Sequence, residues 1–338
     1  MPSGKREQVA RICERTLITK LLEVLPKRNL LLVLNYHRIG DASQTPYDSG
    51  TFSATAEEFE RQIRYFRRQF HVASLEEAVS AALDGGPRQT ILLITFDDGY
   101  IDNYNVAFPI LRSLNTPAAF FLPTAFVGTG RLPWWDIIAY VIKGSKRENI
   151  RVRYPREVSF DVRAQGLSNV TMRILGLFKD PSMQDGERFI SELETACESP
   201  RPAPTADRCF LNWEEAREMQ EAGMGFGSHT HTHEILAKLS ASRQQEELAT
   251  SRQILESHLG RRIDTLAYPV GAPDTFSDET VQLLQRCNYR ASFSFHGGMN
   301  RPGEIQPFNI KRYGVGEQSH SRLRLQTALG TVTTRYWL

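Results

Sequence analysis

The stretch Leu92-Leu93-Ile94-Thr95-Phe96-Asp97-Asp98-Gly99-Tyr100 joins an apolar run to two adjacent carboxylates and a glycine. The unbroken run of β-branched residues and leucine at 91–94 predicts a strand that is covered on both faces, and the Asp-Asp-Gly triplet predicts a turn that ends it. Parallel α/β folds keep their active sites at the carboxyl ends of their strands. The sequence therefore places Asp97 and Asp98 where such folds carry out their chemistry.

These two carboxylates are expected to have different roles. Neighbouring residues of an extended chain point to opposite sides, so Asp97 and Asp98 reach the same place only if the turn twists them together. One of them can hold a metal ion while the other takes up a proton. The alternative is a solvated Asp-Gly turn, which is common because both residue types favour turns.

The composition is that of a soluble globular enzyme. The 338 residues are 41% hydrophobic and 24% charged, and the formal net charge of +2 comes with scattered basic residues, so a nucleic-acid partner is not favoured. The four cysteines lie far apart without Cys-x-x-Cys spacing, which is typical of reduced thiols. The sequence has neither a secretory h-region at its N-terminus nor an apolar run long enough to cross a membrane, which predicts a cytoplasmic location.

The first segment of the chain is an N-terminal extension, residues 1–29. Apolar residues recur at helical spacing over residues 8–25, which predicts one amphipathic helix. We expect this helix to pack against the domain that follows. Peripheral contact with a membrane surface is the alternative function of such a helix.

Strand-like and helix-like segments alternate through the rest of the chain. Strands are expected at 30–35, 89–95, 118–122, 223–226, 265–268, 290–295 and 308–313, and helices at 57–70, 75–83, 104–113, 213–221 and 242–259. This alternation predicts βαβ units and a parallel sheet or barrel over residues 30–338. The pattern is interrupted at about 131–210, which predicts an insertion.

A second chemical stretch is Gly227-Ser228-His229-Thr230-His231-Thr232-His233, which holds three of the eight histidines. Histidines four apart share a face of a helical turn, and alternating histidines share a face of a strand, so either structure would bring His229 and His233 to one metal ion. His231 is expected to be a bystander. Histidine nitrogens with one carboxylate suit Zn²⁺, with Ni²⁺, Co²⁺ or Fe²⁺ as alternatives. Three protein ligands would leave positions for water and substrate, as in a hydrolytic site.

Three motifs carry a resemblance to a known family. With Thr95-Phe96-Asp97-Asp98-Gly99-Tyr100, His229-Thr230-x-x-His233 and Tyr268-Pro269-Val270-Gly271, the sequence resembles the NodB-type polysaccharide deacetylases, carbohydrate esterase family four, over about residues 30–315. The resemblance implies a distorted (β/α) barrel of seven or eight strands. It also implies metal-dependent removal of acetyl groups from N-acetylhexosamine units. Tyr36-His37-Arg38 resembles the branch that acts on exopolysaccharides such as poly-N-acetylglucosamine.

The resemblance also implies roles for individual residues. Asp97 takes the position of the general base, while Asp98, His229 and His233 take the positions of the metal ligands. The remaining motif positions imply substrate contacts: the backbone N–H of Tyr100 as an oxyanion donor, and Tyr268 and Pro269 in the third motif. The expected partner is an N-acetylated carbohydrate.

The sequence departs from the family pattern in two places. The third motif usually carries an arginine that orients the base, whereas Ala267 stands there in this chain. Arg312, on the last expected strand, is the candidate replacement, and a solvated surface charge is the alternative. The late Leu-x-His motif that supplies the general acid is not recognisable, so His37, His296 and His320 are the candidates. His37 is favoured because it follows a strand at its carboxyl end.

Trp134 and Trp135 open the insertion. Their aromatic faces could stack on sugar rings. The alternative is that both tryptophans belong to a small core of the insertion itself.

Together these features predict a metal-dependent hydrolase that removes acetyl groups from N-acetylhexosamine units of a bacterial polysaccharide or its lipid-linked precursor. One alternative is an O-deacetylase, or another acyl-amide hydrolase, with the same site. A second alternative is a non-catalytic glycan-binding or scaffold protein that keeps the barrel. The sequence does not predict an oligomeric state.

Overall fold

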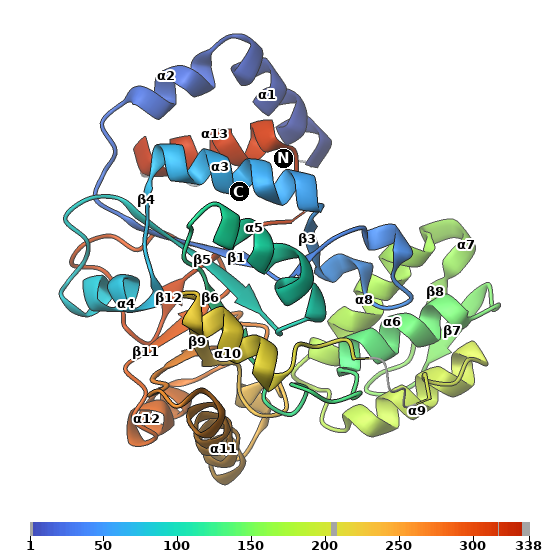
Figure 1. The fold of residues 1–338 in the computed structure, drawn as a ribbon. Helices are drawn as coiled ribbons and strands as arrows, with labels where there is room; N and C mark the ends of the chain where they lie inside the picture. The colour runs from blue at the N-terminus through green and yellow to red at the C-terminus, as the bar shows by residue number, and fades with distance from the viewer. Residues whose placement is uncertain (1–2, 204–207, 317, 333–338) are drawn as a thin grey trace. The chain divides into compact units, whose positions relative to one another are not determined.

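The computed structural model describes residues 3–203, 208–316 and 318–332 (Figure 1). The chain divides into two compact units. The barrel unit consists of Met1–Gly40, Phe52–Val127 and Phe210–Leu338, and the insertion unit consists of Asp41–Thr51 and Gly128–Cys209.

The centre of the barrel unit is a parallel sheet whose main path has eight strands. Their order is β12 (Ile310–Lys311), β11 (Ala291–Ser294), β10 (Thr265–Ala267), β9 (Gly225–Ser228), β6 (Ala119–Leu122), β5 (Ile91–Asp97), β1 (Leu31–Tyr36) and β13 (Tyr313–Gly314). A short strand, β4 (His71–Val72), also pairs with β5. The predicted parallel strand arrangement is therefore present.

The two ends of this sheet are formed by consecutive pieces of chain. β12 and β13 are separated only by Arg312. β12 pairs with β11, and β13 pairs with β1 on the opposite edge of the path. One five-residue segment thus bridges both edges, so the sheet is nearly closed into a barrel.

Helices surround the strands of the barrel unit, as Figure 1 shows. They are α3 (Ala56–Gln69), α4 (Leu75–Leu83), α5 (Phe108–Ser113), α10 (Trp213–Glu221), α11 (Ala241–Leu259), α12 (Asp278–Arg286) and α13 (His320–Val332). Five of them begin after a polar N-cap residue whose side chain accepts the backbone N–H three residues on: Thr55, Ser74, Asn212, Ser240 and Ser277. These caps satisfy one of the amide groups that a helix start leaves without a partner.

Side chains of the strands alternate between the outside and the inside of the barrel. In β1, Leu32 and Leu34 join the outer core with the surrounding helices, whereas Leu31 and Val33 join the inner core. This alternation is the period of two that any strand has. Four residues of α4 belong to the same inner core, so this helix closes the barrel on one side.

The same alternation places polar side chains at the carboxyl ends of the strands. Asn35 continues the inward series of β1, and Thr95 and Asp97 continue that of β5. All three are buried. The last inward-facing layer of the barrel is therefore polar, and it includes the two positions, Asn35 and Asp97, that line the candidate site.

The N-terminal extension differs from the single helix predicted over 8–25. It forms α1 (Ser3–Arg15) and α2 (Ile18–Val24), separated by Leu17 with a left-handed φ of 61°. The bend lets both helices pack on α13, a helix that the sequence analysis did not predict. Apolar spacing continues through the bend, which is why the pattern alone did not reveal it. No helix among the described residues is long and apolar enough to span a bilayer.

The insertion unit has its own core. Its elements are α6 (Trp134–Gly144), the antiparallel pair β7 (Asn149–Val152) and β8 (Val158–Asp161), α7 (Val162–Gln165), α8 (Leu167–Lys179) and α9 (Gly186–Cys197). Residues 41–51 also belong to it, which the sequence analysis did not predict. The backbone N–H of Asp48 donates to Asp136 Oδ1 at 3.0 Å, and Lys143 Nζ donates to the Thr45 carbonyl at 3.0 Å.

Candidate active site

The Asp97-Asp98-Gly99 turn brings both carboxylates to one place. Asp97 is the last residue of β5, and Asp98 and Gly99 follow with left-handed φ angles of 72° and 71°. Such a conformation is unusual for a residue with a side chain. As a result, His229 Nε2 lies 3.8 Å from Asp97 Oδ2 and 3.6 Å from Asp98 Oδ1.

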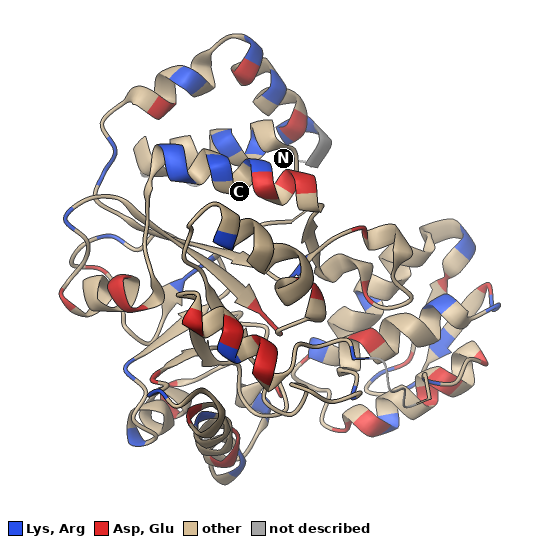
Figure 2. Ribbon diagram, viewed as in Figure 1, with Lys and Arg blue, Asp and Glu red and all other residues tan. Residues whose placement is uncertain are grey.

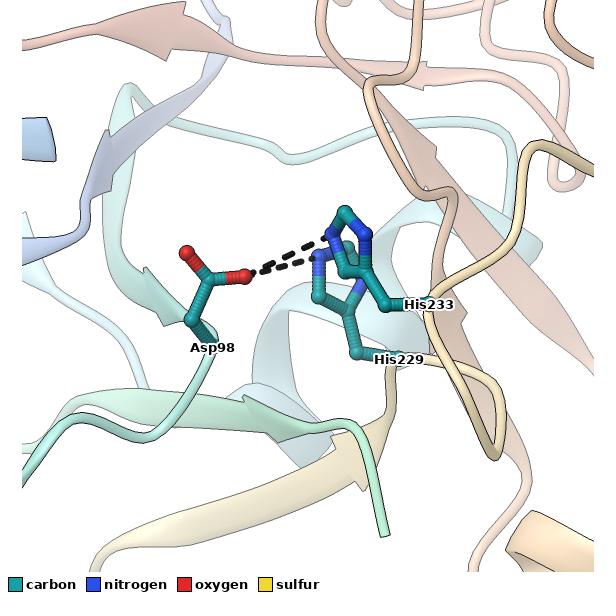
Figure 3. A group of neighbouring side chains, drawn as sticks. All are labelled: Asp98, His229 and His233. Atoms are coloured by element: carbon teal, nitrogen blue, oxygen red, sulfur yellow. Dashed lines mark ion pairs between the residues drawn. The ribbon is translucent and has the colours of Figure 1, made fainter. Parts of the chain in front are cut away.

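Asp98, His229 and His233 form a buried group that fits a metal ion (Figure 3). Asp98 Oδ1 lies 3.6 Å from His229 Nε2 and 3.5 Å from His233 Nε2. Ligand atoms about 2.0–2.2 Å from a tetrahedral ion lie about 3.4 Å from one another, so the separations match a shared ion. These three residues are the ones that could hold a metal.

The protonation of the two histidines also suits metal binding. Burial lowers the pKa of His229, and burial together with the charge of His229 lowers the pKa of His233 well below its usual value. Neutral imidazole is the form that binds a metal. His229 Nδ1 lies 2.7 Å from the Ala267 carbonyl, so Nδ1 carries the proton and leaves Nε2 free to face Asp98.

The histidine-bearing segment is neither a helical turn nor a strand, contrary to both sequence interpretations. It is a loop after β9 in which Thr230 and His233 have left-handed φ angles of 65° and 61°. The backbone N–H of Thr230 donates to Ser228 Oγ, and that of His233 donates to Thr230 Oγ1, both at 3.1 Å. Loop geometry therefore brings the two imidazoles together, with ring centroids 4.6 Å apart.

Glu247 of α11 holds this loop in place through hydrogen bonds. Its carboxylate accepts the backbone N–H groups of His231 and Thr232 at 2.9 and 2.7 Å, and the Thr232 hydroxyl at 2.8 Å. Arg243 donates to the same carboxylate at 3.1 Å. Sequence reasoning missed Glu247 because nothing distinguishes it from the other acidic residues of its helix.

Asp97 is held by a buried arginine. Arg312 Nη1 donates to Asp97 Oδ1 at 2.7 Å, Arg312 Nη2 donates to Oδ2 at 2.8 Å, and Asn35 Nδ2 adds a third bond to Oδ2 at 3.0 Å. Burial by itself raises the pKa of Asp97, but the charge and hydrogen bonds of Arg312 outweigh it and hold that pKa well below its usual value. Arg312 is 0% exposed, which excludes the surface-charge alternative.

Arg312 is itself fixed from two sides. Its Nε donates to the Ser294 carbonyl at 3.1 Å, and its Nη1 donates to Asn35 Oδ1 at 2.8 Å. The Thr95 hydroxyl also donates to Asn35 Oδ1, at 2.8 Å. Asn35 was missed as a site residue, although an amide at the end of an otherwise apolar strand was a usable signal.

The three candidate acids have different surroundings in the structure. The charge of His37 lowers the pKa of Asp97, and its main chain is held by Ser53 Oγ at 3.0 Å and by Asn103 Nδ2 at 2.7 Å. His296 is exposed and lies 3.2 Å from Asn309 Oδ1. His320 lies on α13, 3.8 Å from Glu58. His37 is thus the candidate whose charge acts on the proposed base.

Arg38, the residue after His37, contacts the segment that holds Tyr100 and Asp102. Arg38 Nε donates to Asp102 Oδ2 at 2.8 Å, and its guanidinium lies over the rings of Phe52 and Tyr100, 4.2 and 4.5 Å from their centroids. The Tyr100 ring also stacks on Phe210 at 4.7 Å. The Tyr100 side chain is therefore enclosed, and the oxyanion role of its backbone N–H stays a prediction.

The other predicted substrate contacts are enclosed as well. Tyr268 is 1% exposed, and its hydroxyl donates to the Phe308 carbonyl at 2.9 Å while its ring stacks on Phe276 at 4.0 Å. Pro269 is buried beside it. Trp135 is buried in the core of the insertion unit, and Trp134 stacks on Phe178 at 4.3 Å in the same unit. A sugar contact by any of these residues stays a prediction.

Glu247 provides a test of how the metal group is held. Replacing Glu247 with alanine removes the acceptor for two loop N–H groups, and we expect metal affinity to fall about 10- to 100-fold, as for other residues that orient metal ligands. Titration of the metal-free protein with Zn²⁺ measures this. Glu246→Ala is the matched control, because Glu246 is the exposed neighbour on the same helix and pairs only with Arg243 among the described residues. Equal affinities for the two variants would contradict the role given to Glu247.

Comparison with known proteins identifies the family. The family described as polysaccharide deacetylase matches residues 84–292, which is more than half of the chain. A curated Bacillus subtilis (strain 168) protein, YxkH, whose name places it among polysaccharide deacetylases, is 20% identical over 270 residues. That match covers 79% of this chain and 65% of YxkH, just under two thirds of its length.

Two solved structures resemble this fold closely. The Streptococcus pyogenes deacetylase PplD, solved in complex with acetate, has a TM-score of 0.57 at 19% identity, over 90% of this chain and 98% of PplD. IcaB from Ammonifex degensii has a TM-score of 0.57 at 21% identity, over 88% of this chain and 97% of IcaB. These likenesses are of fold, and they confirm the predicted distorted barrel. By the match of its sequence, the chain belongs to the polysaccharide deacetylase family.

Proposed function

We propose that this protein hydrolyses the acetamido groups of N-acetylhexosamine units, in a polysaccharide or its lipid-linked precursor, with the help of a divalent metal ion. One observation carries the proposal. A buried Asp98–His229–His233 group lies beside Asp97, a carboxylate that Arg312 holds by two hydrogen bonds and keeps ionised. Membership of the polysaccharide deacetylase family supports the substrate class.

The three ligands explain what a metal ion would add. Bound by Asp98, His229 and His233, the ion would polarise the acetyl carbonyl and acidify a water molecule at its open positions. Two imidazoles and one carboxylate suit Zn²⁺ best, with Ni²⁺, Co²⁺ and Fe²⁺ as alternatives.

Asp97 is the group that takes the proton of the attacking water. As the water oxygen forms its bond to the acetyl carbonyl carbon, the proton passes to the Asp97 carboxylate, and the carbonyl electron pair moves to oxygen. A carboxylate with a strongly lowered pKa is a weak base, so the acidity of the water has to supply much of the driving force. Arg312 keeps the base ionised and oriented.

His37 is our candidate for the second proton transfer. An amine is a poor leaving group until it is protonated, and His37 would donate that proton as the carbon–nitrogen bond breaks. The products are acetate and a free amino sugar. The non-catalytic alternative rested on the missing arginine and the missing late histidine. Arg312 and His37 offer a residue for each of these positions.

Acetate release tests the proposed reaction. We expect the Zn²⁺-loaded protein to release acetate from N-acetylglucosamine oligomers and the metal-free protein to release almost none. O-acetylated sugars serve as the comparison substrate. Release from the O-acetylated sugars alone would favour the O-deacetylase, and no release with any of the four metals would favour a glycan-binding or scaffold protein.

Exchanging each aspartate for asparagine separates the two roles. Asp97→Asn should keep its metal and lose most turnover, because the ligand set is intact while the base is absent. Asp98→Asn should lose bound metal. Metal content and turnover, measured on both variants with thermal unfolding as a check of folding, decide the assignment. If Asp97→Asn lost its metal and Asp98→Asn kept it, the two roles would be reversed.

The general acid can be identified from a pH profile. We expect His37→Ala to lower turnover by about 100- to 10,000-fold without changing metal content, because a general acid contributes about that much. The alkaline limb of the kcat/KM profile should disappear, since it reports deprotonation of the proton donor. His296→Ala and His320→Ala are the controls and should keep both turnover and limb. Near-parental turnover of His37→Ala with the limb in place would move the acid elsewhere.

A further inference from the structure

The N-terminal helices α1 and α2 expose a group of large aliphatic side chains. Six of the nine exposed large hydrophobic residues described in the chain lie here: Ile12, Leu17, Ile18, Leu21, Val24 and Leu25, with exposed fractions from 38% to 77%. Ile18, Leu21 and Val24 are three apart within the short helix α2, so they share one side of it, and Leu17 and Leu25 flank its two ends. We call these six residues the outer face.

The acidic side chains of the same helices point the other way, to α13. Glu7 accepts a hydrogen bond from the Ser319 hydroxyl and lies 3.6 Å from Arg322 Nη1. Arg324 pairs with both remaining acids, at 2.9 Å from Glu14 and 2.8 Å from Glu23. All three negative charges of the extension are therefore neutralised against the barrel unit.

The basic side chains remain on the solvent side. Arg11, Arg15 and Lys20 are exposed, and in the described part of the chain their side chains form neither an ion pair nor a hydrogen bond. Figure 2 shows the basic and acidic positions of α1 and α2. The exposed surface of the extension therefore combines aliphatic side chains with uncompensated positive charge.

We propose that the outer face binds the surface of a bilayer that contains anionic phospholipid. An amphipathic helix of this kind lies in the interfacial plane, with aliphatic side chains among the acyl chains and basic side chains near the phosphates. A second copy of this chain is a poor occupant. It would bring Arg11, Arg15 and Lys20 of both copies together, while Glu7, Glu14 and Glu23 of the extension are already engaged by Arg322 and Arg324 of α13.

This interaction is separate from the candidate active site. The proposed metal ligands and base lie on β5 and on the loop after β9, whereas the outer face belongs to α1, α2 and the residues that flank α2. Exposed positions also have little packing to lose, so substitutions there should leave both the fold and the catalytic group intact.

Vesicle co-sedimentation tests the proposal. The full chain should sediment with vesicles of phosphatidylcholine mixed with phosphatidylglycerol, bind pure phosphatidylcholine vesicles far more weakly, and be released as the salt concentration rises. Leu21→Ser with Val24→Ser should weaken binding at least about tenfold, because two aliphatic side chains no longer enter the bilayer. The triple variant Arg11→Gln, Arg15→Gln, Lys20→Gln should lose the preference for anionic vesicles.

Leu83→Ser is the matched control. Leu83 lies on α4 and is 40% exposed, so its loss removes a comparable aliphatic side chain away from the outer face. This variant should bind vesicles as the parent does. The proposal is overturned if the parent does not bind the mixed vesicles, or if Leu21→Ser with Val24→Ser binds them equally well. It is also overturned if sedimentation equilibrium shows a dimer of the parent that the double variant loses, since the face would then join two copies.

Discussion

The ion pair between Arg312 and Asp97 connects the segment that nearly closes the barrel with the candidate active site. Arg312 is the single residue between the strands that form the two edges of the sheet, so the position that nearly closes the barrel also places a guanidinium inside it. Both ends of the pair are buried. Removing one partner of such a pair costs about 3–5 kcal/mol, because the other charge is left without compensation. The segment that nearly closes the barrel thus also holds the proposed base.

The pair also gives two adjacent carboxylates different surroundings. Asp97 is the last residue of β5 whose side chain faces the inside of the barrel, and both of its oxygens accept hydrogen bonds from Arg312. Asp98 leaves the strand with a left-handed backbone and turns one oxygen toward the two imidazoles. The local backbone therefore separates a carboxylate held by a cation from one available to a metal. An exchange of the two roles would require a different turn.

The parts of this arrangement that depend on local sequence were predictable. The sequence predicted that Asp97, Asp98, His229 and His233 lie at the carboxyl ends of parallel strands. The prediction used the apolar run before Asp97, the Asp-Asp-Gly turn and the spacing of the two histidines, and the structure has these residues there. Contacts between distant segments were not predictable in the same way. Arg312 and Asp97 are 215 residues apart, and Asn35 reaches the same carboxylate from a third strand. The left-handed residues of the histidine loop, the support from Glu247 and the bend at Leu17 arise from tertiary packing, which no periodicity in the sequence reports.

Arg312 is expected to keep the proposed base ionised, and the acid limb of the kcat/KM profile measures this most directly. In the parent, Arg312 outweighs burial and lowers the pKa of Asp97. In Arg312→Met burial acts without that cation and raises this pKa, so the carboxylate protonates, and activity is lost, at higher pH than in the parent. We expect the acid limb to move to higher pH in Arg312→Met, and to move less in Arg312→Lys, in protein that still binds its metal. An acid limb at the same pH in all three proteins would contradict this role of Arg312.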